Sequence, residues 1–169
     1  MADALRRNEP VPLAPVEFVG AKVALEPPMA RYSLRARDAD LLDRIIGGGL
    51  PQRIGATSDG IVCLGPDEWL MRVPTGTAAP GRPGETISVV DVSERQVAIA
   101  VEGARAVEVL RGGNPLDLEN FPVGSGKRTI FEGVEIILLR ESETRFVVEV
   151  WRSFAEFVWG VLVKAASEG

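Results

Sequence analysis

Short apolar runs separated by tight turns are the feature that most limits what this chain can fold into. The clearest turn, Gly65-Pro66-Asp67, joins an apolar run at 61–64 to a second run at 69–73. Glycine and proline favour turn dihedrals, and aspartate can hydrogen-bond within its own turn. Runs of this length are typical of strands. Further strands are expected at residues 32–36, 86–93, 96–101, 129–131, 134–140 and 145–150. We expect the strands at 86–93 and 96–101 to pair with each other and the last three to form a meander.

Capping residues and apolar spacing predict three helices between these strands. Asp38 is the expected N-cap of the first, which Gly47-Gly48-Gly49 ends. A short second helix follows Gly103. In the last helix, Ser153 and Glu156 have the spacing of a capping box. The core-facing stripe of that helix is expected to contain Phe154, Phe157, Val158, Val161, Leu162 and Ala165.

Together these elements predict an α+β fold with antiparallel sheets, built from two interlocked strand-helix-strand halves. Residues 1–28 are rich in proline, which removes backbone donors, so we expect an extended Pro-rich arm there. Its apolar residues are too many for a solvated tail, so this arm should lie on its own core or on a partner. Residues 29–169 would then form the folded domain.

Composition excludes several classes of function for the 169-residue chain. Its formal net charge is −5, which argues against nucleic-acid binding through clustered Lys and Arg. It has no histidine, the commonest general base and a frequent metal ligand. Its single cysteine, Cys63, lies in an apolar run, which indicates a buried structural thiol and a reducing compartment. No apolar run reaches the ~18 residues of a membrane span, so we expect a cytoplasmic protein.

Motifs that could carry chemistry are better explained as structure. Gly124-Ser125-Gly126-Lys127-Arg128-Thr129 resembles the end of a phosphate-binding loop, but it leads into a strand where that loop must lead into a helix. Asp91, before Ser93, and Asp117 are expected to cap turns. Arg152 is a candidate for an ion pair. The tryptophans Trp69, Trp151 and Trp159 are expected to be core or interface anchors. The sequence thus predicts no catalytic, cofactor-binding or metal-binding residue in this chain.

Several segments taken in order resemble a known family. Asp91-Val92-Ser93 followed by Val101-Glu102-Gly103-Ala104-Arg105-Ala106 is similar to the opening of the aminomethyltransferase-type tetrahydrofolate-binding domain. The segments at 64–70, 114–118, 121–124 and 151–154 resemble, within that superfamily, the gamma subunit of heterotetrameric sarcosine oxidase. The similarity runs from about residue 30 to the C-terminus. The sequence departs from the family pattern at Asn114, where a cysteine is expected, and in the loop at 76–84.

The resemblance implies the non-catalytic small subunit of an enzyme that oxidatively demethylates sarcosine to glycine, in sarcosine catabolism and one-carbon metabolism. The expected partners are alpha, beta and delta subunits, which would hold FAD, FMN, NAD and tetrahydrofolate. The alternatives are a stand-alone folate-binding transferase of the same fold and a flavoprotein assembly factor. Self-association of the isolated chain and contact of this subunit with folate are open.

Overall fold

A computed structural model describes residues 9–81 and 86–168 and places eleven strands and three α-helices there. The six-stranded sheet has the order β1-β2-β8-β11-β10-β9, and the five-stranded sheet has the order β4-β5-β6-β3-β7. All pairs are antiparallel. The strands of the six-stranded sheet are β1 (Val16–Phe18), β2 (Ala21–Leu25), β8 (Gln96–Glu102), β9 (Ser125–Phe131), β10 (Val134–Ser142) and β11 (Arg145–Trp151). Those of the five-stranded sheet are β3 (Met29–Ala36), β4 (Thr57–Ser58), β5 (Ile61–Gly65), β6 (Glu68–Pro74) and β7 (Ile87–Asp91).

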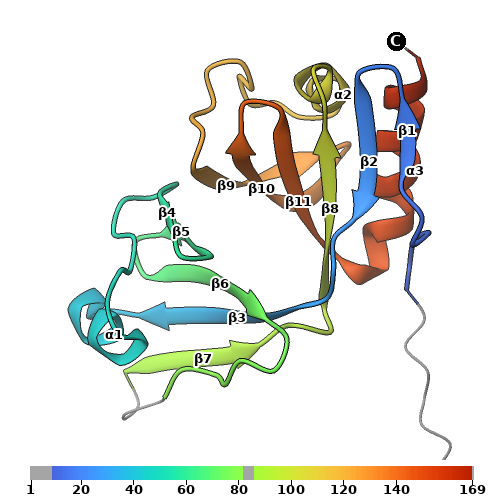
Figure 1. The fold of residues 1–169 in the computed structure, drawn as a ribbon. Helices are drawn as coiled ribbons and strands as arrows, with labels where there is room; N and C mark the ends of the chain where they lie inside the picture. The colour runs from blue at the N-terminus through green and yellow to red at the C-terminus, as the bar shows by residue number, and fades with distance from the viewer. Residues whose placement is uncertain (1–8, 82–85, 169) are drawn as a thin grey trace, which may run out of the picture.

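The strands of one sheet run across those of the other, and the chain passes between the sheets twice (Figure 1). It leaves the six-stranded sheet after β2, completes the five-stranded sheet with β3 to β7, and returns through β8. The predicted α+β fold with two antiparallel sheets is confirmed.

Three helices lie outside the sheets: α1 (Ala39–Ile46), α2 (Ala106–Arg111) and α3 (Ala155–Ser167). The start and end of α1 were predicted correctly. The Asp38 carboxylate accepts a hydrogen bond from the Leu41 backbone N–H, and Gly47 adopts the left-handed conformation that ends the helix.

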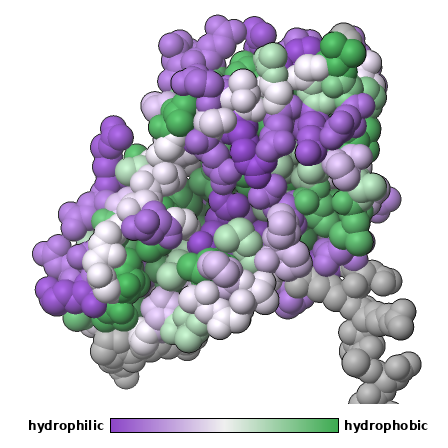
Figure 2. Space-filling view, in the orientation of Figure 1, coloured by the Kyte–Doolittle hydropathy of each residue, from purple (hydrophilic) through white to green (hydrophobic). Residues whose placement is uncertain are grey.

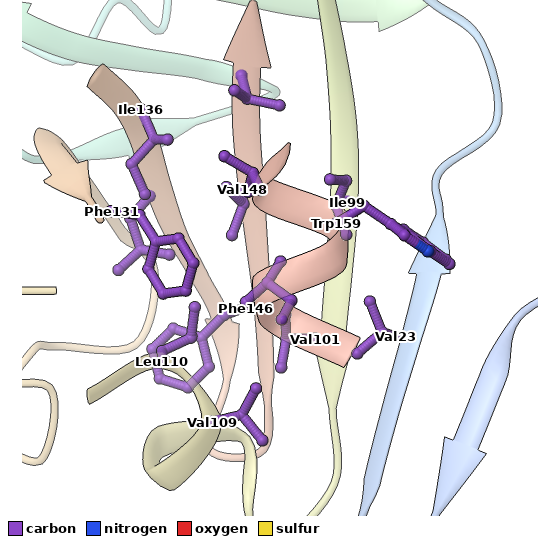
Figure 3. Packing of buried hydrophobic residues seen from close by; sticks show 14 of the residues in the cluster. Val23, Ile99, Val101, Val109, Leu110, Phe131, Ile136, Phe146, Val148 and Trp159 are labelled. Carbon is purple, nitrogen blue, oxygen red and sulfur yellow. The ribbon is translucent and has the colours of Figure 1, made fainter. Parts of the chain in front are cut away.

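The main core lies between the six-stranded sheet and the helices α2 and α3. Side chains from the sheet and both helices converge there (Figure 3). A second core lies between the five-stranded sheet and α1. A smaller apolar cluster joins the facing surfaces of the two sheets, with Val62 and Leu70 from one and Ile137, Leu139 and Val147 from the other.

Residues 16–25 of the extended arm expected at 1–28 do lie on the core of the chain itself, but the separation of this arm from the folded domain is wrong, because they form two strands of the large sheet. β1 pairs with β2, and β2 pairs with β8 from Lys22 opposite Glu102 to Leu25 opposite Ile99. The prolines at 10, 12, 15, 27 and 28 flank these strands and do not interrupt them. Every residue of β1 and β2 therefore keeps the backbone N–H group that sheet pairing needs. Residues 1–8 of the expected arm lie outside the described residues.

Gly103, in the motif at 101–106, brings the β1–β2 turn against the start of α2. Its φ is +116°, and a side chain there would collide with the carbonyl oxygen of Gly20. The same carbonyl accepts the Arg105 backbone N–H at 2.9 Å. Only glycine allows this approach at this dihedral.

The predicted pairing of residues 86–93 with 96–101 is also wrong. β7 pairs with β3 in the five-stranded sheet, whereas β8 lies between β2 and β11 in the other. The turn at 92–95 therefore crosses between sheets, and its backbone bonds to Arg31 and Arg152 hold it there.

The last helix begins later than its capping signal predicted. A 3₁₀ turn, η1 (Arg152–Phe154), precedes α3, and no side chain caps the helix. The buried face carries Ala155, Val158, Trp159, Leu162 and Ala166. Phe154 and Phe157 are 46% and 52% exposed. Packing of α3 against β2 and α2 determines which face is buried, and the Ser153–Glu156 spacing does not.

The corrected face of α3 leads to a stability prediction. Replacing buried Leu162 by alanine should cost about 2–5 kcal/mol, because it leaves a cavity in a packed core. Replacing exposed Phe157 by alanine should cost under about 1 kcal/mol. Denaturant unfolding of both variants measures the difference. Equal losses would mean that Phe157 belongs to the core.

Candidate functional site

A buried ion network joins the two sheets. Arg31 on β3 and Arg72 on β6 are cross-strand neighbours, and both face Glu149 on β11 of the other sheet. The Arg31 Nε donates to Glu149 Oε2 at 2.7 Å, and the Arg72 Nε lies 2.7 Å from Glu149 Oε1. The second contact is an ion pair without hydrogen-bond alignment, since its N–H is not directed at the oxygen. One carboxylate therefore neutralises one of two adjacent buried guanidinium groups.

Burial makes this network a strong constraint. The side chains of Arg31, Arg72 and Glu149 are 2%, 9% and 0% exposed. A buried charge whose partner is missing costs several kcal/mol, so each group depends on the others. Glu141, 3.5 Å from the Arg72 Nη1 and 40% exposed, adds a second carboxylate where the network meets solvent.

The Asp91-Val92-Ser93 motif supports this network. The Asp91 carboxylate accepts the Ser93 backbone N–H at 2.9 Å, and the Ser93 hydroxyl accepts the Arg31 backbone N–H at 2.9 Å. Hydrogen bonds from Ser93 hold the pKa of Asp91 below its usual range. The predicted turn-capping role is confirmed, and the motif also fixes the strand that carries Arg31.

A second ion cluster, formed by Arg35, Glu68 and Arg128, lies at the outer edge of the junction. Glu68 on β6 receives two hydrogen bonds from Arg128 on β9, at 3.0 and 2.6 Å. The Arg35 Nη2 lies 3.1 Å from the same carboxylate. The hydrogen bond from Arg128 is the main reason that the pKa of Glu68 lies below its usual range. Because β6 and β9 belong to different sheets, this pair also joins them.

A cleft lies between the two clusters. Glu68, Gln96, Arg128, Glu149 and Trp151 are among the residues that line it, and its volume is about 90 Å³. Gln96, at the start of β8, is 6% exposed, and its side-chain oxygen has no hydrogen-bond partner among the residues that the structure describes. At the same cleft, the Arg95 guanidinium lies over the Trp151 ring at 5.2 Å. The side-chain oxygen of Gln96, unpaired within the described parts of the chain, makes the cleft suited to binding a hydrogen-bond donor.

The remaining residues singled out in the sequence have structural roles. Asp117 caps its turn through Asn120, and Arg152 makes the predicted ion pair, 3.6 Å from Glu9. Cys63 is buried, which raises the pKa of its thiol. Gly124 precedes β9, so the segment resembling a phosphate loop does lead into a strand. Asn114, where a cysteine was expected, donates to the Ile130 carbonyl and accepts from the Leu116 N–H.

Of the tryptophans, Trp69 and Trp159 are buried, as predicted for core anchors, while Trp151 is 42% exposed. Arg31, Arg72, Glu149 and Gln96 were not identified from the sequence. A signal was available for Glu149, which is a single acidic residue inside the apolar run 146–150. Among the residues that the structure describes, no group of three or more acidic or thiol side chains could hold a metal ion.

The fold is that of aminomethyltransferase-type proteins and their relatives. A solved heterotetrameric sarcosine oxidase from Corynebacterium sp. U-96, in complex with pyrrole 2-carboxylate, contains a chain that matches with a TM-score of 0.76 and 25% identity, over 88% of this chain and 84% of that one. The glycine cleavage system aminomethyltransferase T from Bartonella henselae matches with a TM-score of 0.64 and 14% identity, over 85% of this chain and 45% of that one. The second match shows the fold alone.

Sequence comparison defines the family within that fold. The model of the sarcosine oxidase gamma subunit family matches residues 44–168. Sarcosine oxidase gamma subunits from Arthrobacter sp. and from Corynebacterium sp. (strain U-96) are each 30% identical, over 73% and 72% of this chain. The matches span 66% and 65% of those relatives, just under two thirds of their length. This chain belongs to the sarcosine oxidase gamma subunit family.

None of the helices within residues 9–81 and 86–168 has the length and apolar character that crossing a membrane requires.

The Glu68–Arg128 pair predicts a pH dependence of stability. The folded-state pKa of Glu68 is below its unfolded value, so its stabilising contribution is present at neutral pH and is lost as the pH falls through the folded pKa. The difference in unfolding free energy between wild type and Glu68→Gln should therefore shrink between about pH 5 and pH 3. Denaturant titrations at several pH values measure it. A difference that stays constant over this range would contradict the pairing.

Proposed function

We propose that this chain is the non-catalytic small (gamma) subunit of a heterotetrameric sarcosine oxidase, which oxidatively demethylates sarcosine to glycine. The observation that carries the proposal is the family match over residues 44–168. The similarity to a chain of a solved heterotetrameric sarcosine oxidase supports it. The partners would be alpha, beta and delta subunits, with FAD, FMN, NAD and tetrahydrofolate bound to them.

The polar groups of this chain support a role in assembly. Glu149, Glu68 and Asp91 are each engaged by side chains or backbone of the chain itself. A catalytic acid or base must instead reach a substrate proton. We therefore propose that no residue of this chain performs catalysis or binds a metal or cofactor, and that it contributes a surface to the complex.

The alternative function, a stand-alone folate-binding transferase, is supported only by the shared fold with the 14%-identical aminomethyltransferase T. A cytoplasmic location fits the single buried thiol of Cys63, because proteins of reducing compartments keep their cysteines free.

Co-expression tests the proposal. The chain produced with alpha, beta and delta subunits from the same genome should elute with them at one-to-one stoichiometry, in a preparation that oxidises sarcosine. The chain produced alone should be colourless and inactive, because flavin chemistry would lie on the partners. A complex of the other three subunits that forms fully and excludes this chain would contradict the assignment. So would stoichiometric flavin absorbance in the isolated chain.

A further inference from the structure

Resting on the proposed function, we propose that the cleft between the sheets is a docking site for a partner subunit. A segment of that subunit inserts one neutral, hydrogen-bond-donating side chain beside Gln96. It also covers the aromatic patch formed by Trp151, Phe154 and Phe157. The site thus binds a protein side chain and not a cofactor.

Gln96 gives the chemistry of the inserted group. Its side chain is 6% exposed and lines the cleft, and within the described ranges its Oε1 accepts no hydrogen bond. A buried acceptor without a donor is destabilising relative to a satisfied one. A donor entering the cleft would remove that cost. The carboxylates of Glu68 and Glu149 in the cleft are already neutralised by arginines, so the group that enters need not be charged.

The volume of the cleft favours a side chain over a free ligand. The cleft measures about 90 Å³. Sites for cofactors and other small molecules commonly measure about 300–1,000 Å³. A side chain such as that of Asn, Gln, Ser or Thr fits the smaller volume. Protein association would also supply the apolar contact that a small ligand could not.

The aromatic patch supplies that contact. Trp151, Phe154 and Phe157 are 42%, 46% and 52% exposed and fall within seven residues of chain, at the end of β11 and the start of α3. Phe154 and Phe157 are three residues apart in a helical turn and thus lie on one side of it. Figure 2 shows the hydropathy of one face of the molecule, where hydrophobic side chains also gather on the side that carries β1 and β2. Exposed aromatic residues contribute little to the stability of a monomer, but they dominate binding energy at interfaces.

Arg95 indicates the charge of the partner. Its guanidinium lies over the Trp151 ring, and within the described parts of the chain no carboxylate is within ion-pair distance of it. In contrast, Arg128 and Arg152 are paired with Glu68 and Glu9. An exposed arginine beside an aromatic ring is complementary to an acidic residue. We therefore expect an Asp or Glu near the inserted donor.

The test measures assembly of variants with the partner subunits. Gln96→Leu removes the acceptor at nearly constant volume, and the double variant Phe154→Ser/Phe157→Ser removes the exposed rings. Each should weaken association tenfold or more in a titration monitored by light scattering or calorimetry. Ile54→Ser, 57% exposed and outside the cleft lining, is the matched control and should bind as wild type does.

Melting of the free chains separates docking from folding. Gln96→Leu should leave the melting temperature unchanged or raise it, because it removes an unsatisfied buried acceptor. A lowered melting temperature with intact association would overturn the docking role of Gln96. If the Gln96 variant and the phenylalanine variant both bind the partner subunits as tightly as the unmodified chain does, the proposed docking site is wrong. The proposed function would still stand, provided that the unmodified chain joins the complex. A wild-type chain that fails to join the complex would refute the proposed function instead.

Discussion

Glu149 is the side chain on which the junction of the two sheets depends. It comes from β11 of the large sheet and contacts Arg31 and Arg72 on adjacent strands of the small one. Without it, two guanidinium groups would face each other across β3 and β6, away from water. Such an arrangement is stable only when the charges are paired. The network thus fixes the register and the distance of one sheet relative to the other.

The apolar cluster and the cleft follow from that geometry. Val147, two residues before Glu149 on β11, points to the same face and packs into the apolar cluster between the sheets. On the outer side, Glu68 and Arg128 form the second link, and the cleft between the two links contains Gln96. A chain whose buried charged groups hold its own sheets together is suited to presenting a rigid surface. This is the role that we propose for it in the oxidase complex.

Local signals in the sequence were sufficient for much of the fold. The turn at Gly65-Pro66-Asp67, the cap at Asp38 and the meander predicted from 129 to 150 involve neighbours in the chain, and short-range signals specify them. The first strand of that meander begins earlier than predicted, at Ser125. Contacts between residues that are far apart in the sequence could not be predicted from such short-range signals. The pairing of β2 with β8, the separation of β7 from β8, and the contact of Glu149 with Arg31 join distant segments. The helix at 155–167 was predicted, but packing turned Phe154 and Phe157 outward.

Replacement of Glu149 by glutamine tests most directly whether this network holds the sheets together. The isosteric variant keeps the packing but removes the carboxylate that Arg31 and Arg72 share, and leaves only the partly exposed Glu141 beside Arg72. The free energy of unfolding should therefore fall by about 3–5 kcal/mol. Glu119→Gln, which breaks a pair with Arg111 whose side chains are 67% and 62% exposed, is the control and should cost at most about 1 kcal/mol. Equilibrium denaturation of the two variants beside wild type gives both values. A Glu149→Gln chain as stable as the control would contradict the account.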